Sequence, residues 1–246
     1  MTNGWQYWRL LLSLGLSLVI LVGCLGNRYT NRRLDLTAEE SQKFTQPLRI
    51  TAGNESNFSP DLAPNQRYVL FASNKRGNMD IWEKKTKGGN AQQVTFHPAD
   101  DFNPVVSPDG ERIAFVSRRA DAGGDIHILD TGFSFTRFLG SNEGSVDQVN
   151  SRNTIDSDPI WFPDSERLIF VARRPGERVG SLYTVDIADL KPVVLNDLKG
   201  EHPHINDQGD QVVYVNSDGV FTYNFKDEPV LVFNQGLPFV GQPRFV

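Results

Sequence analysis

Short apolar runs separated by polar, turn-forming residues fill most of this chain, a pattern that predicts β-strands. The clearest stretch comprises a short strand, a turn at Ser107-Pro108-Asp109-Gly110 and a longer run that contains Ile113-Ala114-Phe115-Val116. Proline at the second position and glycine at the fourth suit a type I turn. The β-branched and aromatic residues of the second run are typical of a buried strand. This stretch therefore predicts a β-hairpin.

The hairpin recurs along the chain at a regular interval. Its first proline returns at intervals of 44, 55 and 44 residues, and its opening alone returns 40 residues later; the positions are Pro60, Pro104, Pro159, Pro203 and Pro243. Two further apolar segments follow each of the first four hairpins. Four strands per unit at a period near forty are typical of β-propeller blades. The sequence therefore predicts an all-β fold, a propeller of four four-stranded blades.

The two ends of the repeat region supply additional strands. Residues 34–37 and 48–51 stand where third and fourth strands stand before the other prolines, and residues 242–246 match a first strand. Together these terminal strands could form a split or partial fifth blade, which would cover exposed sheet edges. No second strand is evident for it. A four-bladed ring with extra strands, an irregular five-bladed ring and an open part of a larger propeller all remain compatible with the pattern.

The repeat resembles that of the TolB-like β-propellers. The best matches to the repeat are Ser107-Pro108-Asp109-Gly110, which an apolar strand follows, and Asp80-Ile81-Trp82, which stands later within its own repeat. The likeness extends over roughly residues 47–246. This family includes envelope scaffolds, propeller domains of peptidases and carbohydrate-active proteins. The resemblance implies a rigid propeller in the bacterial cell envelope and does not by itself choose among these functions.

The N-terminal region has the pattern of a bacterial lipoprotein signal. Residues 10–22 are an uncharged apolar run, shorter than a membrane-spanning helix requires and of the length of a signal peptide. Leu21-Val22-Gly23-Cys24 resembles the lipobox, which implies cleavage before Cys24 and lipidation of its thiol. We expect a signal peptide at 1–23, a lipidated cysteine and tether at 24–46 and the propeller at 47–246. The alternative is an uncleaved signal anchor.

Three further features of the sequence affect the expected partners, disulfide content and location. The chain has a net charge of −5, which disfavours a nucleic-acid partner. Its single cysteine excludes an intramolecular disulfide. Leu25, rather than aspartate, follows Cys24 and favours the periplasmic side of an outer membrane.

A polar residue precedes each first proline of the repeat. If those prolines begin the inner strands, these side chains converge at one mouth of the central channel, where symmetry would create a polar binding site. The predicted binding residues are Ser59, Asn103, Asp158, His202 and Gln242. The alternative is that they only cap the strand starts with local hydrogen bonds. We expect Asp101 and Glu201 to make the mouth acidic, and the long stretch 140–157 to overhang it.

The sequence offers few residues for catalysis. It contains no Gly-x-Ser-x-Gly elbow, phosphate-binding glycine loop or Cys-x-x-Cys pair, so we predict no cofactor and no catalytic residue. His202 and His204 share a face of a strand and, with His97, define a metal-site alternative. Trp82, Trp161 and Phe162 are expected in the blade core. Asp80 and Asp125 are expected to accept hydrogen bonds from nearby turn amides.

These observations predict a non-enzymatic envelope lipoprotein, anchored to the membrane by lipid, whose propeller binds an envelope protein or a small ligand. The alternatives are a carbohydrate-active enzyme with its site at the channel mouth, as in lyase-like propellers that hold a metal, and a degenerate propeller fragment.

Overall fold

The computed structural model describes residues 49–51, 53–131, 146–149, 153–233 and 242–245. The chain divides into two compact units, residues 1–49 with 246 and residues 50–245, and every described strand lies in the second. The predicted signal peptide, Cys24 and the tether lie outside the described residues. Within the described part, no helix is long and apolar enough to span a bilayer.

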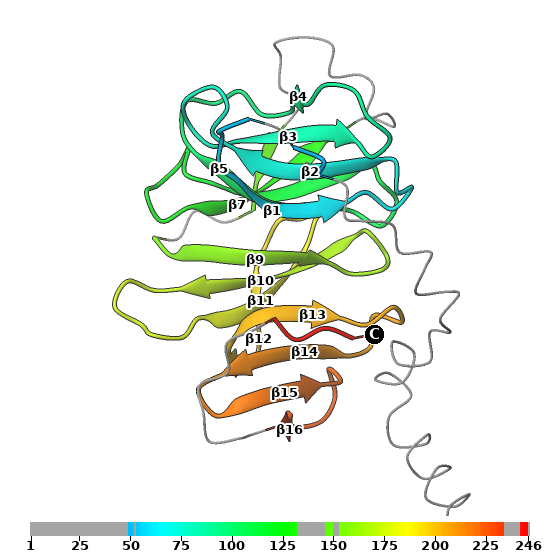
Figure 1. Cartoon of the computed structure of the whole chain (residues 1–246). Coiled ribbons are helices and arrows are strands. Elements are labelled where there is room, and N and C mark those ends of the chain that lie inside the picture. Colours follow the sequence, from blue (N-terminus) through cyan, green and yellow to red (C-terminus); the bar gives the residue numbers. More distant parts are fainter. Residues whose placement is uncertain (1–48, 52, 132–145, 150–152, 234–241, 246) are drawn as a thin grey trace, which may run out of the picture. The chain divides into compact units, whose positions relative to one another are not determined.

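Four antiparallel sheets of four strands each make up the unit 50–245, and in each sheet the strands follow one another in sequence order (Figure 1). Blade one contains β1 (Asn57–Leu62), β2 (Tyr68–Ser73), β3 (Asp80–Lys85) and β4 (Gln92–Gln93). Blade two contains β5 (Asp101–Val106), β6 (Arg112–Ser117), β7 (Asp125–Asp130) and β8 (Val146–Gln148). Blade three contains β9 (Ile155–Trp161), β10 (Arg167–Arg173), β11 (Ser181–Asp186) and β12 (Val193–Lys199). Blade four contains β13 (Glu201–Ile205), β14 (Val212–Asn216), β15 (Gly219–Tyr223) and β16 (Val230–Phe233).

This arrangement confirms the all-β fold of four four-stranded blades. Of the terminal segments, residues 34–37 lie outside the described part, and neither 49–51 nor 242–245 forms a strand. Residues 242–245 lie beside β13 (Figure 1), where the backbone N–H of Phe245 donates to Nδ1 of His204 at 3.3 Å. Thus the last described segment stands where a further inner strand would stand, without strand hydrogen bonds.

Hydrophobic cores fill the spaces between successive blades. Leu70 and Ile81 of blade one pack with Phe115 of blade two. Equivalent clusters lie between blades two and three and between blades three and four. The innermost strands pack in the order β1, β5, β9, β13. Among the described residues, no corresponding cluster joins blade four to blade one.

The aromatic residues expected in the core are buried there. Trp82, Trp161 and Phe162 are 4%, 6% and 2% exposed, which confirms that prediction. Asp80 accepts a hydrogen bond from the side-chain amide of Asn78, in the bend before β3, at 3.3 Å. The prediction for Asp125 needs a correction, because its buried Oδ1 has no partner among the described residues. Both carboxylates also accept a hydrogen bond from a glutamine side chain of the fourth strand, Gln93 or Gln148, at 2.9 Å. These bonds join the third strand to the fourth within a blade.

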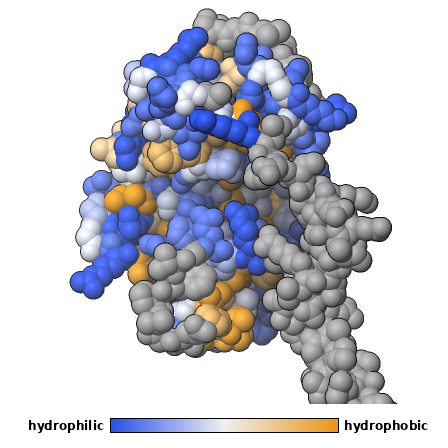
Figure 2. All heavy atoms as spheres, viewed as in Figure 1, coloured by the Kyte–Doolittle hydropathy of each residue, from blue (hydrophilic) through white to orange (hydrophobic). Residues whose placement is uncertain are grey.

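Exposed large hydrophobic side chains are few in the described part, and most belong to blade four. The complete β16 strand is exposed, from Val230 to Phe233, together with Phe58, Leu62 and Val193 elsewhere. Figure 2 shows hydrophobic surface at the lower end of the view, over blade four.

Candidate binding cavity at the propeller mouth

Each inner strand is interrupted at the same place by a residue with positive φ followed by proline. The φ angles are 48° at Ser59 and 51° at Asn103, Asp158 and His202. In every blade, the pairing between first and second strand shifts register across this dipeptide, which is a β-bulge. Short polar residues tolerate the left-handed region better than β-branched ones. The positive φ therefore favours a polar residue before each proline, independently of any role of its side chain in binding.

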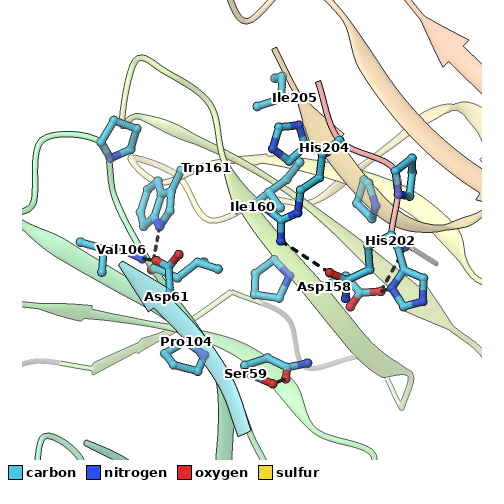
Figure 3. Close-up of a pocket in the computed structure, with 18 of the residues that line it drawn as sticks. Ser59, Asp61, Pro104, Val106, Asp158, Ile160, Trp161, His202, His204 and Ile205 are labelled. Atoms are coloured by element: carbon cyan, nitrogen blue, oxygen red, sulfur yellow. Dashed lines mark hydrogen bonds and ion pairs between the residues drawn. The ribbon is translucent and has the colours of Figure 1, made fainter. Parts of the chain in front are cut away.

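The four bulges and the C-terminal segment surround one cavity of about 870 Å³. All five residues predicted from the sequence line it: Ser59, Asn103, Asp158, His202 and Gln242. Neighbouring members hydrogen bond to one another (Figure 3). The Ser59 hydroxyl donates to Oδ1 of Asn103 at 2.5 Å, and the backbone N–H of His202 donates to Oδ2 of Asp158 at 3.2 Å. The five predicted side chains thus lie around one cavity, and the two hydrogen bonds link neighbouring blades.

Asp158 and His202 are the two ionisable residues of the ring, and their side chains lie beside each other. Nδ1 of His202 lies 3.2 Å from Oδ2 of Asp158, the same oxygen that accepts its backbone N–H. Figure 3 shows the two side chains turned toward each other. A carboxylate beside an imidazole can hold a cationic ligand group or orient the imidazole for proton transfer.

A second ring lies one residue after each of these prolines, two residues after the first ring, and was not predicted from the sequence as a set. These residues also line the cavity; they are Asp61, Val105, Ile160, His204 and Arg244. The alignment on the prolines contained this signal, since the position after each proline is as regular as the one before it. Its side chains are charged or titratable in blades one and four and in the C-terminal segment, and apolar in blades two and three. The cavity is therefore polar on one side and apolar on the other.

Burial adjusts the protonation of two groups in the second ring. Desolvation raises the pKa of Asp61, while the backbone N–H of Val106, which donates to its Oδ2 at 2.8 Å, and the charge of Arg244 act in the opposite direction. Desolvation also lowers the pKa of His204; Arg244 adds to this effect and Asp207 opposes it. The neutral imidazole of His204 accepts the N–H of Phe245, which ties the C-terminal segment to the cavity wall.

Trp161 forms part of the apolar side. Its indole Nε1 donates to the backbone carbonyl of Val105 at 3.1 Å, so its single polar atom is satisfied by the neighbouring blade. Figure 3 shows this bond beside Val106. The indole is part of the blade core and, at one edge, part of the cavity wall.

Two expectations about the mouth are wrong. Asp101 is buried and pairs with Nη2 of Arg119 at 2.9 Å, and Glu201 lies 3.6 Å from Arg173; neither lines the cavity. The acidic residues that do line it are Asp61, Asp158 and Asp207. The stretch 140–157 falls largely outside the described residues, so its position stays a prediction.

The structure does not bring together the three histidines of the metal-site alternative. His202 and His204 line the cavity, but His97 does not, and its Nδ1 instead accepts the backbone N–H of Ala99 at 3.1 Å. The described part of the chain contains no group of three histidine, cysteine, aspartate or glutamate side chains placed to hold a metal ion.

Comparison with known proteins gives relatives of the same fold. No protein-family model matches the chain. A TolB homologue of Chlorobium chlorochromatii is 28% identical over 180 residues, 61% of this chain and 39% of that protein. The crystal structure of TolB from Acinetobacter baumannii superposes with a TM-score of 0.62 at 18% identity, over 78% of this chain and 47% of that one. The fold is a TolB-like β-propeller.

The TolB-like propeller occurs with other functions as well. An oligogalacturonate lyase in complex with manganese superposes with a TM-score of 0.59 at 13% identity, over 76% of this chain and 55% of that one. An uncharacterized protein of Agrobacterium fabrum is 32% identical over 130 residues, 52% of this chain and 44% of that protein. The chain spans less than half the length of both sequence relatives. The fold alone therefore does not fix the activity.

Proposed function

We propose that this chain is a non-enzymatic lipoprotein of the bacterial cell envelope, and that its propeller binds an envelope protein or a small ligand at the mouth of the cavity. The observation that carries the proposal is the convergence of five polar side chains from four blades and the C-terminal segment on one cavity. Concave sites with a few converging polar groups on a rigid frame are typical of binding sites.

The chemistry of the cavity suits recognition. Ser59, Asn103 and Asp158 present hydrogen-bonding groups at the mouth, and Val105, Ile160 and Trp161 offer apolar surface beside them. A peptide segment with both polar and apolar side chains would match this division. The left-handed backbone at each bulge fixes the polar residues, so little ordering is needed on binding.

The location in the envelope rests on the sequence. Cys24 follows a lipobox-like segment, and the relatives named TolB support an envelope role. Cys24→Ser should leave a larger, unprocessed precursor that incorporates no radiolabelled fatty acid. Processing and labelling at the wild-type level would refute the lipid anchor, without bearing on the binding site.

A photo-crosslinking amino acid at position 242 tests the binding function in cells. Gln242 is exposed and lines the cavity, and its backbone does not have the positive φ of the other ring residues. We expect a defined crosslinked product, and expect Asp158→Asn to abolish it without lowering the melting temperature. The same crosslinker at Asp147, an exposed residue of β8 outside the cavity, is the matched control. Identical products from both positions would contradict the proposal.

A carbohydrate-active enzyme is the second candidate, favoured by the Asp158–His202 pair in the cavity and by the lyase of similar fold. It requires that the purified chain cleave acidic oligosaccharides and lose this activity on His202→Ala. A protein that does not cleave such substrates while its crosslinks persist would leave the binding function as the better account.

A further inference from the structure

The outermost strand of blade four differs from the outermost strands of the other blades. β16 pairs with β15, and no other described strand pairs with its second edge. Val230, Leu231, Val232 and Phe233 are 60%, 47%, 59% and 45% exposed. Because successive side chains of a strand point to opposite faces, both faces of β16 carry side chains that are about half exposed.

The corresponding strands of the other blades carry the features that prevent edge-to-edge pairing. β4 has only two residues, and β8 has three with Asp147 in the middle. β12 is longer, but Asn196 and Asp197 have φ angles of 46° and 52° and its pairing shifts register beside them. Short length, charge and bulges are the usual protection of an edge. β16 has a register shift at Val232 and otherwise neither charge nor proline.

We propose that β16 pairs with β16 of a second copy of this chain, antiparallel, so that the two blade-four sheets join across a two-fold axis. A two-fold contact uses the same surface on both copies, and an uncharged apolar strand is complementary to itself. Pairing satisfies the backbone groups of both edges and removes the four exposed side chains partly from water.

The charges around the strand select the antiparallel arrangement. Asp227 and Glu228 precede β16, whereas residues 229–243 contain no charged residue. In an antiparallel pair, the acidic residues of the two copies stand at opposite ends of the joined strands, apart from each other. A parallel pair would place each acidic residue opposite its own copy, which destabilises a sheet.

Sedimentation velocity of the full chain in density-matched detergent, over a concentration series, tests the proposal. We expect a reversible monomer–dimer equilibrium, and expect Val232→Glu to weaken the dimer by at least about tenfold because it buries an unpaired charge at the contact. Val193→Glu is the matched control: Val193 is 62% exposed and also lies on an outermost strand, β12, so the dimer should persist. Val230→Lys is a second variant if Val232→Glu lowers the melting temperature.

Hydrogen exchange distinguishes the other possible occupants of the edge. The amides of β16 should become more protected as the wild-type concentration rises, and should not do so in Val232→Glu. A monomer at every concentration would overturn the proposal. Equal weakening of the dimer by both glutamate variants would also overturn it, because association would then not depend on β16. Protection of β16 in a purely monomeric sample would mean that another segment of the same chain covers the edge, and this too would refute it.

Discussion

Ser59 and Asn103 occupy the same position in neighbouring blades, and the hydroxyl of Ser59 donates to Oδ1 of Asn103 at 2.5 Å. Both residues have a positive φ, and both precede the first proline of their blade. The bulge thus aims each side chain along the ring toward its neighbour. Asp158 and His202 are also linked across neighbouring blades, but there the backbone N–H of His202 donates to Oδ2 of Asp158.

Substitutions at Asn103 separate the backbone role from the side-chain role. Asn103→Gly keeps the conformational freedom and loses the bond to Ser59, which should lower the free energy of unfolding by about 0.5–1 kcal/mol. Asn103→Val also forces a β-branched residue into the left-handed region, at a further cost of about 1–2 kcal/mol. Urea denaturation of both variants measures the difference. Equal stability of the two would mean that the positive φ is not required at this bulge.

The proline spacing was sufficient to predict both the four blades and the five residues around the mouth. Each inner strand has a polar residue followed by proline at the equivalent position. This one periodic signal therefore placed Ser59, Asn103, Asp158 and His202 around the same cavity. Gln242 followed from the same spacing, although its segment forms no strand. A repeat thus predicts convergence even where secondary structure is missing.

Asp101, which precedes the bulge of blade two, could not be placed by strand alternation. Asp101 precedes Asn103 by two positions, and in a regular strand both would share a face. The left-handed residue interrupts that alternation, so Asp101 lies buried against Arg119 while Asn103 lines the cavity. After the bulge the alternation holds, because Asp61 and His204 stand two residues after Ser59 and His202 and line the same cavity. Of this second ring, only His204 was considered from the sequence, as a metal ligand.

Asp125 and Asp80 are equivalent residues that should respond differently to amidation. Oδ1 of Asp80 accepts a bond from Asn78 at 3.3 Å, whereas the buried Oδ1 of Asp125 has no hydrogen-bond partner among the described residues. Desolvation, with the nearby charges of Asp121 and Asp156, raises the pKa of Asp125 to about 7. The folded protein thus keeps a proton that the unfolded chain releases near pH 4. The free energy of unfolding therefore falls as pH rises toward 7.

Asp125→Asn should remove this loss and stabilise the protein by about 2 kcal/mol at pH 8, with a smaller gain at pH 5. Gln148 can still donate to the amide oxygen of the new side chain. Asp80→Asn is the matched control and should bring no gain, because its amide group would face donors. Urea denaturation at the two pH values provides the measurement. A gain of the same size from both variants would contradict the assignment.

His127 should produce the opposite dependence on pH. Its imidazole is buried beside Phe115, and desolvation lowers its pKa to about 4, with Arg119 and His97 adding to the effect. The His127 side chain is protonated below about pH 6.5 in the unfolded chain but only below about pH 4 in the folded protein. The free energy of unfolding should therefore fall by about 3 kcal/mol between pH 6.5 and 4 on account of this residue.

His127→Gln isolates that contribution, because glutamine can donate to the carbonyl of Asp125 as the ring does but does not titrate. The variant should show a smaller loss of stability between pH 6.5 and 4 than the wild type in urea denaturation. Parallel curves for the two proteins would show that His127 already carries its proton in the fold.

The turn between β14 and β15 depends on a glycine that no other residue can replace. Gly219 has a φ of 144°, and a Cβ there would overlap the carbonyl oxygen of Phe233 and lie 2.9 Å from Cδ1 of Leu231. Gly77, with a φ of 119°, has open space around the same position. Gly77→Ala should therefore cost about 1 kcal/mol of backbone strain, whereas Gly219→Ala adds a clash with a backbone atom.

The Gly219→Ala variant can relieve that clash only by moving β16 away from β15. Its β16 amides should exchange hydrogen faster than in the wild type, while those of β14 stay protected, and Gly77→Ala should leave both unchanged. Unaltered exchange of β16 in Gly219→Ala would mean that the strand adjusts without leaving the sheet.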